Sequence, residues 1–155
     1  MLFSDDMKEL LSLFEKYQVE YAVCGGFAVA HYGFIRATMD FDLLVSPGSE
    51  NAGKIMQALR DFGFGDSGIS DEAFLNAGAA VTLGAQPNQI DLLTSMSSHS
   101  TDQIISRAKI VKIKEVSVKM VSYEDLLSAK LEAGRPKDLI DYNELKKIPP
   151  DATSE

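Results

Sequence analysis

Val23-Cys24-Gly25-Gly26 and, after thirteen intervening residues, Asp40-Phe41-Asp42 form the most informative stretch of this sequence. Residues 18–23 predict a strand that enters the glycine pair, and residues 27–32 predict a short helix that leaves it. Glycines at such a turn let backbone N–H groups approach a phosphate closely, and a helix that begins there adds its positive end. The stretch therefore predicts a turn that can bind phosphate.

Carboxylates alternate along the next predicted strand, residues 37–45. Because side chains on a strand repeat with a period of two, Asp40 and Asp42 should point to the same face, where they can share a hard cation such as Mg²⁺. A third acid, Asp91, interrupts the apolar run Gln89-Ile90-Asp91-Leu92-Leu93 in a similar way. Burying like charges is costly unless a cation or hydrogen bonds compensate. The three acids together therefore predict a site for one or two metal ions and a nucleoside triphosphate.

Composition limits the kinds of protein that this chain can be. At 155 residues and 45% hydrophobic, residues 1–148 should form a single domain, with residues 149–155 as an acidic tail. A net charge of −8 argues against a nonspecific nucleic-acid coat, and the single cysteine, Cys24, excludes an internal disulfide and a cysteine-rich zinc site. No run of eighteen apolar residues predicts a membrane span, and Asp5 and Asp6 stand where a signal peptide would be basic. We therefore expect a cytoplasmic protein without a membrane segment.

The remaining pattern predicts an α/β (α+β) fold, a mixed central sheet flanked by helices. Apolar periodicity indicates helices at residues 5–14, 47–62, 71–76, 101–107, 122–133 and 137–147, and further strands at 79–83, 89–93, 109–114 and 116–120. Gly134 should end one C-terminal helix and Pro136 should start the next. A dinucleotide-binding Rossmann unit is excluded because it requires G-x-G-x-x-G, and the next glycine after Gly26 is Gly33.

Two cationic residues are candidates for contact with the triphosphate. Arg36 and Thr38 precede the acids by even steps, so both should share their strand face; Arg36 could bind a phosphate or base, or pair with Asp40. Lys130 belongs to a helical stripe with Leu126, Leu127 and Leu131, which predicts an inward-facing stem. Its ammonium would reach toward a bound triphosphate, or form an ion pair with Asp138 or Asp141.

Gly25-Gly26, Asp40-Phe41-Asp42 and Asp91 together resemble the signature of the polymerase-β-like nucleotidyltransferase superfamily. The longer string from Gly25 to Leu43 looks like the small prokaryotic branch that includes abortive-infection and toxin–antitoxin (AbiEii-like) nucleotidyltransferases. The run Lys130-x-x-x-Gly134-Arg135-Pro136-Lys137-Asp138-x-x-Asp141 is similar to that branch's ending. One departure is Gly26, where many members have serine, so a phosphate contact at this position would come from the backbone.

The resemblance implies a nucleotidyltransferase fold and a metal-dependent mechanism. Asp40 and Asp42 would hold Mg²⁺ or Mn²⁺, and Asp91 would complete a second metal site or act as a base for an acceptor hydroxyl. Gly25 and Gly26 would cradle the phosphates of an NTP, with Lys130 and Arg36 neutralising charge. An acceptor oxygen would attack the α-phosphorus in line, and pyrophosphate would leave.

Three interpretations of the function stay open. The first is an active enzyme that modifies RNA, a protein or a small molecule. The second is a catalytically silent nucleotide-binding or antitoxin-type protein that acts with a cognate partner protein. The third is antibiotic nucleotidylation with an aminoglycoside- or lincosamide-like acceptor, which an acidic chain would suit.

Overall fold

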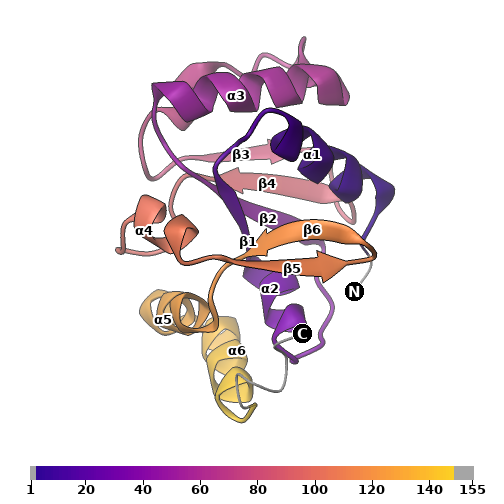
Figure 1. Cartoon of the computed structure of the whole chain (residues 1–155). Coiled ribbons are helices and arrows are strands. Elements are labelled where there is room, and N and C mark those ends of the chain that lie inside the picture. The colour runs from indigo at the N-terminus through magenta and orange to yellow at the C-terminus, as the bar shows by residue number, and fades with distance from the viewer. Residues whose placement is uncertain (1–2, 149–155) are drawn as a thin grey trace.

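A mixed six-stranded sheet with helices on both faces makes up the fold of the computed structural model, which describes residues 3–148 (Figure 1). The α-helices are α1 (Asp5–Lys16), α2 (Gly25–His31), α3 (Ser49–Leu59), α4 (Thr101–Ser106), α5 (Tyr123–Ala133) and α6 (Pro136–Lys146). The strands are β1 (Tyr21–Cys24), β2 (Asp40–Val45), β3 (Ala80–Leu83), β4 (Gln89–Leu93), β5 (Lys109–Ile113) and β6 (Val116–Met120). A π-helical turn, η1 (Arg60–Phe64), and a 3₁₀ turn, η2 (Asp71–Phe74), complete the list.

The order of strands in the sheet is β3-β4-β2-β1-β6-β5. Antiparallel pairing joins β1 to β2, β3 to β4 and β5 to β6, whereas β2 with β4 and β1 with β6 are parallel. The predicted mixed sheet is therefore confirmed. β1 and β2 lie at its centre, which is why nearly all of their side chains are buried.

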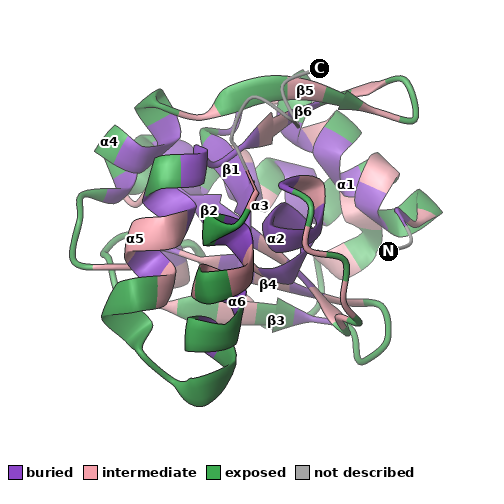
Figure 2. Cartoon of the chain, turned by 90° about the horizontal axis from the view of Figure 1, so that it is seen from below, coloured by how far each residue is buried: buried purple, intermediate pink, exposed green. Residues whose placement is uncertain are grey.

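Two layers of helices enclose the sheet. α1 and α3 cover one face, and α2, α5 and α6 lie on the other (Figure 1). Buried residues gather on β1 and β2, which lie between these layers, and on α2 (Figure 2). Phe41 on β2 is fully buried, and its ring packs edge-on against Phe27 at 5.1 Å and against Phe3 at 6.3 Å. This aromatic cluster holds α2 and the N-terminal segment against the strand that carries the first two acids.

The ends of the C-terminal helices are set by caps, and tyrosine hydroxyls join the segments around them. Ser122 caps α5, Gly134 ends it with a φ of +65°, and α6 starts at Pro136, as the sequence predicts. The Tyr32 hydroxyl at the end of α2 donates to the Val121 carbonyl at 2.6 Å, and that of Tyr123 donates to the Leu145 carbonyl at 2.7 Å. Among residues 3–148, none of the helices has both the length and the apolar character that crossing a bilayer requires.

Several predicted boundaries differ from the structure. The strand expected at residues 37–45 begins only at Asp40, because its neighbour β4 begins at Gln89, which pairs with Asp40. The helix expected at residues 47–62 runs from Ser49 to Leu59, after Gly48 with a φ of +135°. The expected tail, residues 149–155, lies outside the described residues.

Candidate active site

Three acids from two neighbouring strands meet at one place in the sheet. In the parallel pairing of β2 and β4, Asp42 lies directly opposite Asp91, and Asp40 is two residues before Asp42 on the same face. One carboxylate oxygen from each of the three lies within 4.8 Å of the others, and all three side chains are partly exposed. The convergence that the sequence predicts is therefore observed.

Two neighbours of Asp91 that the sequence analysis missed hold its carboxylate in place. Thr82, directly across from it on β3, donates its hydroxyl to Asp91 Oδ1 at 2.9 Å. The Gln89 amide donates to Oδ1 at 3.0 Å and to Oδ2 at 3.1 Å. Gln89 could have been found from the strand period of two, because it precedes Asp91 by two residues on β4. Thr82 could have been found only from the pairing register of β3 and β4, which places it opposite Asp91. These contacts fix the orientation of the third acid.

Gly25 is the residue that the site requires at the start of α2. Its φ of +65° is a conformation that other residues adopt only with strain. A Cβ atom at this position would overlap the Asp42 carboxylate, lying 2.8 Å from its Cγ. At Gly26, a Cβ would lie 2.7 Å from the Thr38 hydroxyl. Both glycines therefore let the turn lie directly against polar groups of the site.

Electrostatic repulsion within the acid cluster shows in the protonation of Asp42. Burial, together with the charges of Asp40 and Asp91, raises the pKa of Asp42 to about 7, while the charge of Lys130 opposes the rise. The acids are thus crowded to the point that one of them holds a proton near neutral pH. A bound cation would relieve this repulsion.

The donor set fits a hard divalent cation. Carboxylate oxygens are the ligands that Mg²⁺ and Mn²⁺ prefer, and three of them converge here from rigid strands. Every fully buried side-chain N or O atom in residues 3–148 has a hydrogen-bond partner. The demand that a cation would meet here is the mutual repulsion of the three acids. We therefore regard Asp40, Asp42 and Asp91 as the candidate metal ligands.

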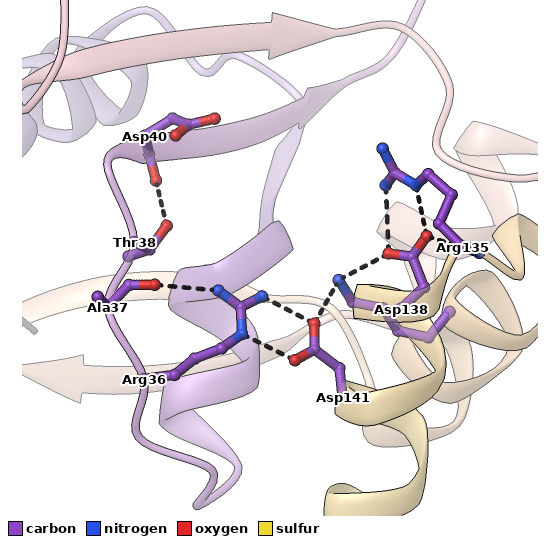
Figure 3. A network of polar contacts seen from close by, with 8 residues as sticks. Arg36, Ala37, Thr38, Asp40, Arg135, Asp138 and Asp141 are labelled. Atoms are coloured by element: carbon purple, nitrogen blue, oxygen red, sulfur yellow. Dashed lines mark hydrogen bonds and ion pairs between the residues drawn. The ribbon is translucent and has the colours of Figure 1, made fainter.

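The two predicted cationic residues lie at the site but contact other carboxylates. Arg36 forms a two-pronged ion pair with Asp141, with both N···O distances at 2.7 Å (Figure 3). The ammonium of Lys130 lies 2.9 Å from Asp141 and 3.5 Å from Asp138. Pairing of Arg36 with Asp40, one of the sequence-based alternatives, is not observed, because Arg36 precedes the first residue of β2 and reaches α6 instead.

The helical stripe predicted for Lys130 is correct only in part. Leu126 is buried, with 1% of its surface exposed, whereas Leu131 is 54% exposed. Lys130 itself is 13% exposed, so its stem does lie inward. The stripe predicted from spacing is wrong at Leu131, which lies largely in solvent although α5 packs against α6 and α2.

A cavity of about 300 Å³ opens beside the acids. Its polar wall includes Asp42, Lys130, Arg135 and Asp138, and Gly25 lies at its edge. The rest of the wall is formed by small or apolar side chains from β1, β4 with the loop after it, and α5: Cys24, Leu93, Ser95, Met96, Leu126, Ala129 and Ala133. Two larger hollows, of about 420 and 450 Å³, lie along β5 and β6 and include none of the three acids. The cavity beside Asp42 is smaller, but of the three it is the one lined by a member of the acid cluster together with Gly25 and Lys130.

Three solved structures share this fold at low sequence identity. A candidate nucleotidyltransferase from Thermotoga maritima has a TM-score of 0.62 at 12% identity, covering 91% of this chain and 90% of its own. The antibiotic-resistance factor ANT(2″)-Ia, in complex with adenylyl-2″-tobramycin, has a TM-score of 0.56 at 13% identity over 90% and 84% of the two chains. The lincomycin-bound lincosamide antibiotic adenylyltransferase LnuA has a TM-score of 0.55 at 17% identity over 94% and 98%. The fold is therefore the one that these nucleotidyltransferase structures share.

A family model described as "Nucleotidyl transferase of unknown function (DUF2204)" matches residues 3–153. The chain belongs to this family, which confirms the nucleotidyltransferase resemblance seen in the sequence. No curated protein matches the chain.

Proposed function

We propose that this protein transfers a nucleoside monophosphate from an NTP to an acceptor hydroxyl with the help of Mg²⁺ or Mn²⁺. The observation that carries the proposal is the convergence of Asp40, Asp42 and Asp91 beside Gly25, at a cavity that also contains Lys130. A family of nucleotidyl transferases and the matching fold support it.

The three acids would divide the work at the reacting phosphate. Asp40 and Asp42 would hold the metal ion, which when bound neutralises charge on the phosphate oxygens. Asp91, fixed by Thr82 and Gln89, would act as a further ligand or accept the proton of the acceptor hydroxyl. The acceptor oxygen forms a bond to the α-phosphorus as the bond from that phosphorus to the β-phosphate oxygen breaks, and pyrophosphate leaves with the electron pair.

The triphosphate would lie between the glycine turn and the cationic side chains. Gly25 and Gly26 allow a close approach of backbone N–H groups, and Lys130 and Arg36 would offset the charge of the phosphates that are not transferred. The sequence from Gly25 to Leu43 resembles the toxin–antitoxin branch. If the chain belongs to that branch, the acceptor would be RNA or a protein, and the chain would act with a cognate partner protein.

Antibiotic nucleotidylation is a second candidate, favoured by a specific observation. Two proteins with this fold are the aminoglycoside-bound ANT(2″)-Ia and the lincomycin-bound LnuA. The net charge of −8 would favour a cationic acceptor in this chain too.

The test is a transfer assay with labelled NTPs and Mn²⁺ or Mg²⁺ against total RNA, candidate partner proteins, aminoglycosides and lincosamides. We expect label on one acceptor class, with pyrophosphate released in equal amount. Asp40→Asn and Asp42→Asn should abolish transfer, whereas Asp125→Asn, which removes a carboxylate paired with Arg107 outside the cavity, should keep it. If the wild-type protein binds NTP but transfers no nucleoside monophosphate to any acceptor in the panel, the result favours the catalytically silent nucleotide-binding function instead.

A further inference from the structure

Asp141 is a buried carboxylate that connects the two candidate phosphate-binding cations. Only 1% of its surface is exposed, yet it accepts hydrogen bonds from Arg36 at both oxygens (Figure 3). Its Oδ2 also lies 2.9 Å from the Lys130 ammonium. Arg36 precedes the strand of the first two acids, and Lys130 lies on α5. One side chain of α6 therefore sets the positions of cations that come from two distant parts of the chain.

The surrounding ion pairs leave part of each cation free. The ammonium of Lys130 contacts Asp141 and Asp138, and since an ammonium carries three N–H donors, one remains for a ligand. Arg36 uses Nε and Nη2 on Asp141 and one Nη1 donor on the Ala37 carbonyl at 3.2 Å, which leaves further N–H groups unused. The same cations are thus held by Asp141 and still able to bind an anion.

The network also carries the charge that an anionic ligand needs. Arg36, Lys130 and Arg135 contribute three positive charges against the two negative charges of Asp138 and Asp141, a net charge of +1. Lys130, Arg135 and Asp138 line the same cavity as Asp42. Two of the three cations of this network, Lys130 and Arg135, therefore line the same cavity as Asp42.

Burial of the two carboxylates costs free energy that only their partners offset. Burial alone would raise the pKa of Asp141, but hydrogen bonds from Arg36 and Lys130 outweigh it and hold that pKa below its usual range. Asp141 therefore stays charged and keeps both cations in place when no ligand is bound.

We propose that Asp141 is a positioning residue that fixes Arg36 and Lys130 as a pair for the triphosphate of the nucleotide substrate. This inference rests on the proposed function. Asp141 touches neither the reacting phosphate nor the metal ligands; it acts through the two cations and sets the affinity for the nucleotide.

The direction of the effect distinguishes this role from simple electrostatics. Asp141 is itself an anion beside an anion-binding site, so removing its charge should tighten triphosphate binding if the cations stayed where they are. If Asp141 positions the cations, Asp141→Asn releases them and binding weakens instead. By the size of charge-assisted hydrogen bonds, we expect about a 10- to 100-fold loss of affinity.

The experiment is calorimetric titration of the full-length protein with ATP and with inorganic tripolyphosphate, both with Mg²⁺. Tripolyphosphate reports the phosphate contacts whatever base the site prefers. The matched control is Asp125→Asn. Asp125 lies on α5, the helix that carries Lys130, and forms a comparable two-pronged ion pair with Arg107, which this substitution breaks. We expect weaker binding of both ligands in Asp141→Asn, unchanged binding in Asp125→Asn, and a raised KM with kcat retained at saturation. Unchanged or tighter binding in Asp141→Asn overturns the inference.

A double-mutant cycle tests whether Asp141 acts through Lys130. In the Lys130→Met background, Asp141→Asn should weaken tripolyphosphate binding less than in the wild type; full additivity contradicts the link. If Asp141→Asn does not fold, Arg36→Met tests the same connection from the other end, and unaltered affinity in that variant overturns the inference. If the wild type binds neither ligand, the proposed function fails and this inference fails with it, whereas wild-type binding that survives in Asp141→Asn refutes only the positioning role.

Discussion

Replacing Asp42 by asparagine should make the metal-free protein more stable at alkaline pH. Burial and the charges of Asp40 and Asp91 raise the pKa of Asp42 from near 3.8 to about 7. In the unfolded chain the same carboxyl loses its proton near pH 4. Between these two values the folded state binds one more proton than the unfolded state, so stability falls as pH rises from about 4 to about 7. Asparagine mimics the neutral form and removes this loss.

The magnitude follows from the size of the displacement. A pKa raised from 3.8 to about 7 corresponds to about 4 kcal/mol of stability lost above pH 7. Asp42 is partly exposed at the cavity, so water and counter-ions screen part of this cost. We therefore expect Asp42→Asn to gain about 2–3 kcal/mol, or about 4–12 °C in Tm for a domain of this size.

The assay is a series of thermal melts in EDTA at pH 4.5 and pH 8 for the wild type, Asp42→Asn and Asp125→Asn. Asp42→Asn should melt above the wild type at pH 8 and together with it at pH 4.5. Asp125→Asn should melt below the wild type at pH 8, because Arg107 loses its partner. Mg²⁺ should raise the Tm of the wild type and narrow its gap to Asp42→Asn. A Tm of Asp42→Asn at or below the wild type at pH 8 would refute the reasoning.

Three further substitutions test separate parts of the structure. Thr82→Val removes the hydroxyl bonded to Asp91, and Mn²⁺ titration should show about a tenfold weaker affinity with little change in Tm; an unaltered affinity would mean that Thr82 does not orient the acid. Gly25→Ala forces a side chain into a left-handed conformation and against Asp42, so the Tm should fall and transfer should cease, and a fully active, stable variant would contradict the close approach described for this turn. Phe41→Ala empties the centre of the aromatic cluster and should cost about 3–5 kcal/mol in urea unfolding, whereas a loss below about 1 kcal/mol would show that the cluster is not part of the packed core.

The elements that the sequence predicts well are those whose signal is local. The strands at residues 89–93 and 116–120 coincide with β4 and β6, because each is a short apolar stretch that follows a turn. The acid cluster was also predictable, since carboxylates that interrupt a buried strand leave few structural explanations. The start of β2 could not be predicted, because it depends on where the neighbouring strand β4 begins.

The contacts of the candidate site that join distant segments were beyond the reach of the sequence. Arg36 and Asp141 are 105 positions apart, and nothing local to either one selects the other. Asp138 and Asp141 could be named as ion-pair candidates for Lys130 because they follow it closely in the sequence, on the helix after the Gly134 turn. That Asp141 also binds Arg36 depends on how α6 packs beside α2 and the segment before β2, which is a tertiary fact.

The place of β1 in the sheet bears on the synthesis of the chain. β1 ends at Cys24 but lies between β2 and β6, and β6 begins only at Val116. A chain emerging from the ribosome can therefore pair β3, β4, β2 and β1 while the other edge of β1, the apolar segment Tyr21–Cys24, stays open. Of the strand pairs in the sheet, β1 and β6 are therefore separated by the longest stretch of synthesis. Shortened chains that end ahead of Met120 are expected to aggregate through that edge. Chains that end soon after it complete the sheet but lack α5 and α6, and with them Lys130 and Asp141.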